Sequence, residues 1–200
     1  MHGLGDSAQG LKPLVDALDL PKQSRIKFIL PDAPLRSITI NQGVSMRGWY
    51  DIKEMNLTAS SDMDAILYSE TQIQHIIQTQ IDAGIPSERI ILAGFSQGGV
   101  MALHVGLKFT QRLGGILALS CYLPLFDALP EGCGPAQIKT PIYLQHGVYD
   151  PIVPLKAGQT AYATLKEAGY NVSRSEYLME HCIDAKQIYT IRHWLLQHLS

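Results

Sequence analysis

The chain has 200 residues, of which 46% are hydrophobic and 17% are charged, and its formal net charge is −2. A hydrophobic share of this size is typical of a globular domain and excludes a disordered chain. Lys and Arg are scattered and form no stripe that would neutralise a phosphate backbone, so we expect no nucleic-acid partner. The longest apolar run, residues 114–126, is interrupted by Pro124 and is too short to span a membrane.

The cysteines indicate the redox compartment. Cys121, Cys133 and Cys182 are few, odd in number and not at metal-ligand spacing, so we expect no disulfide framework and no metal site. This pattern favours a reduced, cytoplasmic setting, and no signal peptide is visible.

In chain order, the sequence begins with a glycine-rich turn. The run HGLGDSA at residues 2–8 is typical of a turn that leaves a buried strand and enters a helix, yet only Met1 precedes it. Beyond it, short apolar runs predict strands over residues 26–31, 89–95, 114–120, 141–147 and 172–178. Helical spacing predicts helices over residues 62–83, 97–109, 157–168 and 184–198, with a loop-rich stretch at 32–61.

The alternation of strands and helices predicts the fold class. Continuous apolar strands separated by helices indicate an α/β fold, with a mostly parallel sheet and helices on both faces, so we expect one domain over residues 1–200. For the first long helix, the expected N-cap is Ser60 or Ser61, and Gly84 is the expected end.

The segment GFSQGG, residues 94–99, lies where the strand 89–95 meets the next helix and contains the pattern G-x-S-x-G. In this context the pattern is that of a nucleophile elbow, in which small residues let strand and helix approach and the serine projects at a helix N-terminus. The alternatives are a plain glycine-rich turn or a phosphate cradle, but G-x-G-x-x-G and a G-K-[ST] ending are absent. Ser96 is therefore the predicted nucleophile.

A serine hydroxyl needs a base and an orienting acid, and in this type of fold the acid and then the base follow the serine along the chain. His181, in the loop between the last predicted strand and helix, is the predicted base. The other histidines come too early, lie inside a predicted helix or lie at a strand end: His2, His75, His104, His146, His193 and His198.

The predicted acid is Asp150, just past the strand 141–147, where Pro151 and Pro154 stiffen the loop. Asp127, after the preceding strand, is its rival. Asp184 is better explained as the N-cap of the last helix.

Attack on a carbonyl carbon creates an oxyanion, which backbone N–H donors stabilise. One donor is expected to be the N–H of Gln97, directly after the nucleophile, and the second is expected in a loop that follows an earlier strand. For that loop HGLGD is the candidate, with Leu4 as the donor and His2 as a structural residue of the turn. A plain glycine-rich loop is the alternative.

The motifs HGLGDSA, GWYDI, GFSQGG, LSCYLP and DPIVP, followed by the histidine loop, resemble the acyl-protein thioesterase and small carboxylesterase (phospholipase/carboxylesterase) family of α/β-hydrolases. The resemblance runs from residue 2 to the C-terminus. It implies a Ser96–Asp150–His181 triad, Leu4 and Gln97 as oxyanion donors, and no metal or organic cofactor. It also implies an acyl-enzyme and hydrolysis of a small-molecule or lipid-like acyl ester or thioester.

The resemblance further implies an apolar groove that holds the acyl chain. A homodimer is also possible on this resemblance. The residues that we predict for the wall of this groove are Trp49, Leu57, Leu123 and Val153.

The histidine loop departs from the family pattern. The family has Gly-His-Ser at the base, where this chain has Glu180-His181-Cys182. The Glu180 carboxylate either raises the pKa of the base or points to solvent. Cys182 has no elbow that would make it a rival nucleophile.

A larger departure concerns the strand that feeds HGLGD. In the family it runs in the middle of the sheet, between the strands that correspond to residues 26–31 and 89–95, and this chain lacks it. A central strand of about five apolar residues, at roughly 1.5–3 kcal/mol per buried side chain, stabilises by about 10 kcal/mol. Net stability is only about 5–15 kcal/mol. We therefore expect a truncated sequence, or a sheet closed by direct pairing of those two strands, or a strand from another chain; we favour truncation.

Three functions follow from these patterns. A serine hydrolase of carboxylic esters or thioesters is the leading hypothesis. The second is a catalytically impaired binding protein of the same fold, which without the strand cannot hold Leu4 in place. The third is a serine hydrolase of another specificity, such as a peptidase or lactone hydrolase, which shares the triad and differs in its pocket.

Overall fold

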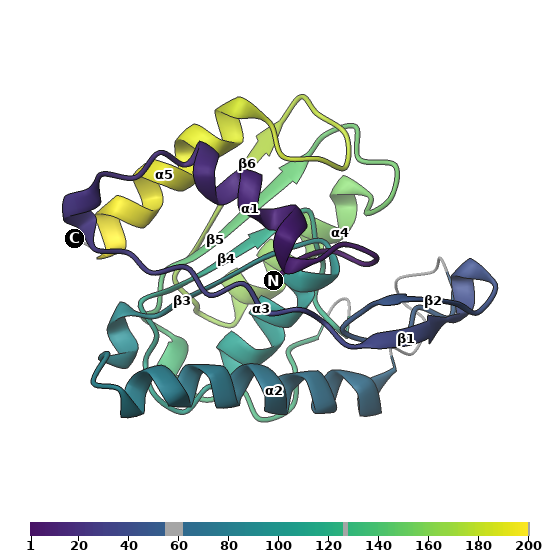
Figure 1. The fold of residues 1–200 in the computed structure, drawn as a ribbon, viewed down its shortest axis with the longest axis horizontal. Helices are drawn as coiled ribbons and strands as arrows, with labels where there is room; N and C mark the ends of the chain where they lie inside the picture. The colour runs from purple at the N-terminus through teal and green to yellow at the C-terminus, as the bar shows by residue number, and fades with distance from the viewer. Residues whose placement is uncertain (55–61, 126–127, 200) are drawn as a thin grey trace.

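Figure 1 shows a computed structural model of the chain, in which a parallel sheet carries helices on both faces. The structure describes residues 1–54, 62–125 and 128–199. The sheet order is β3 (Ile91–Phe95), β4 (Gly115–Leu119), β5 (Ile142–Gly147) and β6 (Val172–Tyr177), with every pair parallel. The predicted fold class and these four strands are confirmed.

The side chains of the sheet alternate between two apolar layers, because successive residues of a strand point to opposite faces. On β4, Ile116 and Ala118 pack in the larger core cluster, whereas Leu117 and Leu119 pack in the smaller one. The larger cluster includes residues of α2 (Met63–Asp82), α3 (Gln97–Lys108) and α4 (Leu155–Glu167). The smaller includes residues of α5 (Ala185–Leu199). Burial on both faces explains why β4, GILAL, is a continuous apolar run, whereas β6, VSRSEY, at the edge of the sheet is mixed in polarity.

The first helix follows the opening turn, as predicted. Helix α1 (Ala8–Ala17) begins after Ser7, whose side chain accepts a hydrogen bond from the Gly10 N–H at 3.2 Å. Helix α2 is capped by Asp62, whose carboxylate accepts from the Ala65 N–H at 3.4 Å. The predicted caps, Ser60 and Ser61, lie outside the described residues, and Asp62 takes the role because the helix begins at Met63.

Two expectations for residues 26–61 are wrong. Residues 26–31 form no strand, because an apolar groove separates them from β3 and leaves their backbone without a ladder to join. The stretch described as a loop contains an antiparallel hairpin of β1 (Leu35–Ile38) and β2 (Val44–Arg47). Its strands are short and mixed in polarity, LRSI and VSMR, so the sequence carries no alternating signal.

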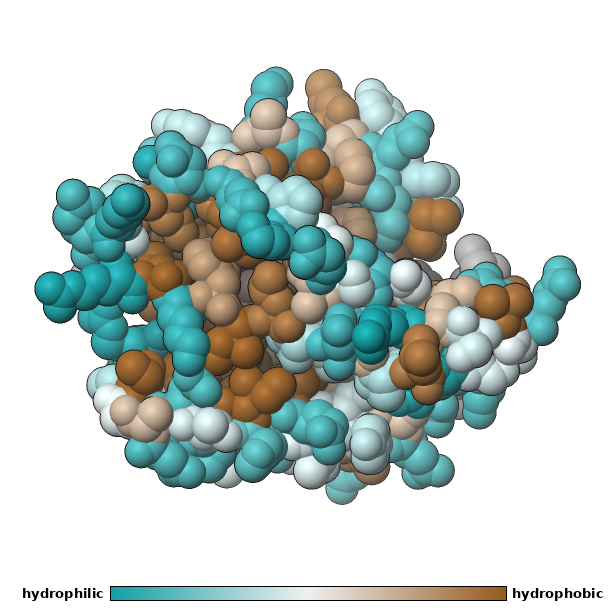
Figure 2. All heavy atoms as spheres, viewed as in Figure 1, coloured by the Kyte–Doolittle hydropathy of each residue, from teal (hydrophilic) through white to brown (hydrophobic). Residues whose placement is uncertain are grey.

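The groove has a volume of about 310 Å³ and is lined by apolar side chains of residues 26–31, β3, α1, α2 and α5. Figure 2 shows apolar side chains gathered on this face, between the N-terminal segment and α2. Because the sheet formed by the described residues ends at β3, it is not closed by pairing residues 26–31 with β3.

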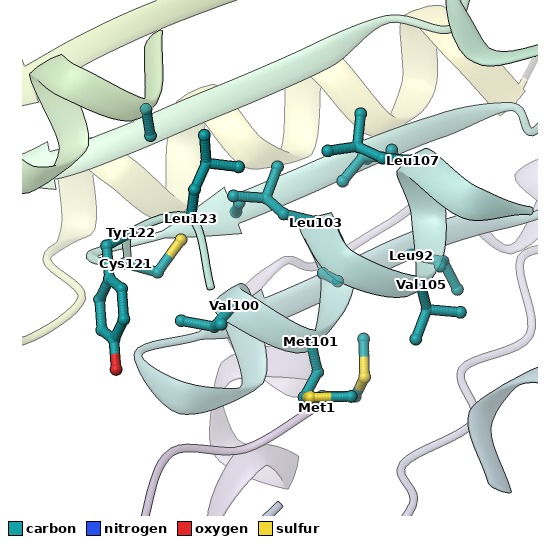
Figure 3. Packing of buried hydrophobic residues seen from close by; sticks show 14 of the residues in the cluster. Met1, Leu92, Val100, Met101, Leu103, Val105, Leu107, Cys121, Tyr122 and Leu123 are labelled. Carbon is teal, nitrogen blue, oxygen red and sulfur yellow. The ribbon is translucent and has the colours of Figure 1, made fainter. Parts of the chain in front are cut away.

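Met1 continues the hydrogen-bond ladder at one end of this groove. Its amino group donates to the Ala93 carbonyl at 2.8 Å, and the Phe95 N–H donates to the Met1 carbonyl at 3.1 Å. The Met1 side chain packs beside Met101 of α3 (Figure 3). Burial lowers the pKa of the Met1 amino group to about 5.

Among the helices that the structure describes, none has both the length and the apolar character that a membrane crossing requires.

Candidate active site

Ser96 lies in a strained turn between β3 and α3. Its φ of 54° and ψ of −121° lie in a region that L-residues rarely adopt, at a cost of about 1–3 kcal/mol. The flanking glycines are required by close packing. A Cβ on Gly94 would overlap the Gly98 carbonyl, and a Cβ on Gly98 would overlap the Met1 carbonyl. The turn thus brings α3 against both β3 and the first residues of the chain.

The ring of His181 connects Ser96 with Asp150. His181 Nε2 lies 2.9 Å from Ser96 Oγ, and Nδ1 lies 2.7 Å from Asp150 Oδ2. A carboxylate only accepts, so Nδ1–H donates to Asp150 and leaves Nε2 to accept from the serine hydroxyl. The ring also packs against Phe95, with centroids 4.7 Å apart. This arrangement can remove the proton of the serine hydroxyl.

Asp150 is held by its own loop. Its side chain is fully buried, and Oδ1 accepts the N–H groups of Ile152 at 2.9 Å and Val153 at 2.8 Å. His146, at the end of β5, braces the same loop, because its Nε2 lies 2.8 Å from the Val153 carbonyl and 3.6 Å from Asp150 Oδ2. Burial lowers the pKa of His146, which favours its neutral form. From the sequence, His146 is predicted only to be structural. Its position four residues before Asp150 is the one signal that it supports the Asp150 loop.

The other candidate side chains of the histidine loop cap a helix or are exposed. Asp184 Oδ1 accepts the Gln187 N–H at 2.7 Å, which is the N-cap role predicted for it. Glu180 and Cys182 are exposed. Asp127, the rival acid, lies outside the described residues.

The N-terminal loop lies against the nucleophile. A Cβ on Gly3 would lie 3.4 Å from the Ser96 Cβ, so the peptide that joins Gly3 to Leu4 is beside Ser96. Gln97 is the first residue of α3, where backbone N–H groups are free to bind an anion. A Cβ on Gly48 would lie 3.0 Å from Leu4 Cδ1 and 3.5 Å from Gln97 Oε1, so the side chains of Leu4 and Gln97 both approach the same point beside this glycine.

The profile of the family described as Phospholipase/Carboxylesterase matches residues 1–199. The chain belongs to this family. The predicted resemblance is thereby confirmed, and the family's activity makes the chain a carboxylic ester hydrolase.

Individual relatives of this phospholipase/carboxylesterase match most of its length. Acyl-protein thioesterase 1 of Gibberella zeae is 41% identical over 185 residues, which cover 88% of this chain and 79% of that protein. Acyl-protein thioesterase 1 of Neurospora crassa is 39% identical over 208 residues, which cover 100% of this chain and 85% of that protein. The crystal structure of Arabidopsis thaliana SOBER1 is 32% identical with a TM-score of 0.87, over 100% of this chain and 96% of that one.

The residues predicted for the acyl groove of this carboxylesterase are buried in its core. Trp49, Leu123 and Val153 are 2%, 0% and 4% exposed and belong to the larger core cluster. Leu57 lies outside the described residues. Trp49 also donates from its indole Nε1 to the His2 carbonyl at 2.9 Å, a contact that sequence reasoning missed.

Within residues 1–54, 62–125 and 128–199, no group of three or more His, Cys, Asp or Glu side chains is placed to hold a metal ion.

Proposed function

We propose that this chain hydrolyses carboxylic esters and thioesters through an acyl-enzyme on Ser96, with His181 as general base and Asp150 as its orienting acid. The observation that carries the proposal is the pair of hydrogen bonds by which His181 joins Ser96 Oγ to the buried Asp150 carboxylate. Family membership supports the class of bond that is cleaved.

In this mechanism His181 Nε2 takes the Ser96 hydroxyl proton as Oγ attacks the acyl carbonyl carbon. Asp150 fixes the tautomer of His181 and stabilises the imidazolium that forms. The oxyanion of the tetrahedral intermediate accepts the N–H groups of Leu4 and Gln97. His181 then gives its proton to the leaving alcohol or thiol. In the second half of the reaction His181 takes a proton from a water molecule, which attacks the acyl-enzyme carbonyl and releases the carboxylic acid from Ser96.

Thioesters are included because the two fungal relatives are acyl-protein thioesterases. The contact of Gly3 with Ser96 supports an enzyme over the impaired binding protein, since it holds the donor loop at the nucleophile. We also propose a cytoplasmic location, which the free thiols of Cys121, Cys133 and Cys182 support.

The test uses the purified chain with a p-nitrophenyl ester and with an acyl thioester whose thiol product is titrated. We expect turnover of both and labelling of Ser96 by a fluorophosphonate probe. Ser96→Ala should abolish both signals. Ser87→Ala is the matched control, because Ser87 is buried in a connecting turn at the amino end of the neighbouring strand β3. Ester hydrolysis that survives Ser96→Ala would overturn the proposal.

A further inference from the structure

The side chain of Gln97 joins the start of α3 to a separate loop. It is 3% exposed, its Oε1 accepts the Trp49 N–H at 2.7 Å, and its Nε2 donates to the Tyr50 carbonyl at 2.7 Å. Both ends of the amide are used, so its orientation is fixed. The same residue supplies a backbone N–H to the proposed oxyanion site, so its side chain and its backbone serve different segments.

Trp49 in turn contacts the N-terminal loop. Its indole N–H donates to the His2 carbonyl at 2.9 Å. Its own carbonyl accepts from Ser69 Oγ of α2 at 2.5 Å. The Trp49 backbone is therefore held from α3 and from α2 at once, and the position of its indole is determined by both helices.

His2 completes the connection at the peptide that carries the Leu4 N–H. Its Nε2 accepts the Ala33 N–H at 3.0 Å, so the proton resides on Nδ1, which donates to the Gly3 carbonyl at 2.7 Å. The Gly3 carbonyl and the Leu4 N–H belong to one planar trans peptide and point in opposite directions. The Asp6 N–H also donates to the Gly3 carbonyl, at 3.2 Å, so the imidazole and this turn contact together set the direction of the Leu4 N–H. Burial lowers the pKa of His2, which keeps this neutral form.

We propose that the side chains of Gln97, Trp49 and His2 are positioning residues that align the Leu4 N–H with the Gln97 N–H on one oxyanion. The proposal rests on the proposed function, since it assigns these side chains to the same site. Oxyanion donors act because they are oriented before charge develops, and a displacement of about 1 Å is enough to lose much of the effect. Three hydrogen bonds, joined through the covalent framework of Trp49 and His2, connect Gln97 with the peptide that carries the Leu4 N–H.

The first variant is Gln97→Met, which keeps the backbone N–H and the side-chain volume but removes both amide contacts. We expect kcat to fall roughly 10-fold or more, while KM changes by less than about two-fold, because the loss acts on the transition state. Inhibition by a trifluoromethyl ketone, whose adduct with Ser96 carries an oxyanion, should weaken by a similar factor.

Gln137→Met is the matched control. Gln137 is 0% exposed, and its amide donates to the Phe109 carbonyl at 2.8 Å and accepts the Leu113 N–H at 3.2 Å. These groups lie at the amino end of β4, whereas Ser96 follows the carboxyl end of β3. The Gln137 amide also donates to the Gln111 carbonyl at 2.6 Å and accepts from Thr140 Oγ1 at 2.8 Å. Gln137→Met should therefore lower the Tm at least as much as Gln97→Met and leave kcat within about two-fold, which separates loss of stability from loss of alignment.

Trp49→Phe removes the indole N–H together with part of the volume of a buried ring, so its Tm is measured alongside kcat, and it serves if Gln97→Met does not fold. The same fall in kcat at constant KM is expected. In the double variant, kcat should fall by a smaller factor than the product of the two single-variant factors, because both substitutions disrupt the same connection between Gln97 and the N-terminal loop. Equal kcat in wild type, Trp49→Phe and any folded Gln97→Met would overturn this proposal alone. If the wild type itself shows no Ser96-dependent hydrolysis, the proposed function fails first, and this proposal with it.

Discussion

Asp150 and His181 form one rigid unit at the site. Oδ2 of the carboxylate lies 2.7 Å from Nδ1 of the imidazole, while Oδ1 is held by two backbone N–H groups of its own loop. The carboxylate thus has no freedom to turn away, and the ring is held in the tautomer that presents Nε2 to Ser96.

Asp150→Asn should therefore lower kcat about 10³- to 10⁴-fold, because the amide NH₂ favours the wrong tautomer of His181. The fluorophosphonate labelling rate of Ser96 should fall in parallel. The Tm provides the stability control, since the carboxylate also accepts the N–H groups of Ile152 and Val153. A variant that keeps more than about a tenth of the wild-type rate would contradict the assignment of Asp150.

Gly98→Ala tests the contact of α3 with the first residues. Its Cβ would overlap the Met1 carbonyl and lie 2.6 Å from the His2 carbonyl. We expect stability to fall by about 1–3 kcal/mol from overpacking, and kcat to fall because the Leu4 peptide shifts. Gly134→Ala is the control, since nothing lies within 4 Å of its Cβ. Equal Tm and kcat in the two variants would show that the close packing is not as described.

Stability should decrease as the pH falls below about 6.5. Burial is the main cause that lowers the folded-state pKa of three histidines from the ordinary value of 6.5: His2, His104 and His146. The unfolded chain takes up these protons at a higher pH than the folded chain does. Their stabilising contribution is therefore complete above pH 6.5 and is lost as the pH falls through the folded pKa values.

Urea unfolding followed by circular dichroism at pH 7.5 and pH 5.5 measures this effect. The free energy of unfolding should be smaller at pH 5.5. His104→Gln should reduce the dependence, because His104 is 1% exposed and its pKa is lowered by burial. A free energy that is unchanged or larger at pH 5.5 would contradict the assignment of these histidines as neutral.

An apolar extension before Met1 should fill the groove beside β3. Met1 already pairs with Ala93 and Phe95 in the manner of a parallel strand, so five β-branched residues placed before it would continue that ladder. The extension also replaces an amino group whose pKa burial lowers to about 5 with a neutral amide. We expect a gain of several kcal/mol in unfolding free energy, since each buried side chain adds roughly 1.5–3 kcal/mol.

The control extension has the same length and alternates Lys, Asp and Pro. Its residues neither fill an apolar space nor complete a ladder, so it should change the Tm only by what the replacement of the Met1 amino group contributes, which both extensions share. Equal Tm values for the apolar and the polar extension would show that the groove does not accept a strand.

The sheet and the meeting of Ser96, His181 and Asp150 could be predicted because their signals are local. The β3 run of apolar residues, the glycines around Ser96 and the order of Asp150 and His181 are each visible in a few residues. Segment 26–31 has the same apolar character, but a strand exists only where a neighbour completes the ladder, and here the groove intervenes. The apolar run itself carries no sign of a missing partner; only the family resemblance indicates that the intervening strand is lacking.

The contacts of Gln97 illustrate what could not be predicted. Its backbone role follows from the position next to Ser96, whereas its side chain binds Trp49 and Tyr50, more than forty residues earlier in the chain. No spacing or periodicity connects such residues. A buried amide at the first position of an apolar helix is the one available signal, because a buried polar group needs partners.

The groove beside β3 also affects how the folded protein behaves in the laboratory. A water-accessible apolar space of about 310 Å³ is a ready binding site for ANS and similar dyes, whose fluorescence normally reports unfolding. Native samples should therefore fluoresce before any heating, and a melting curve followed by such a dye would begin from a high baseline. Circular dichroism or calorimetry avoids that interference.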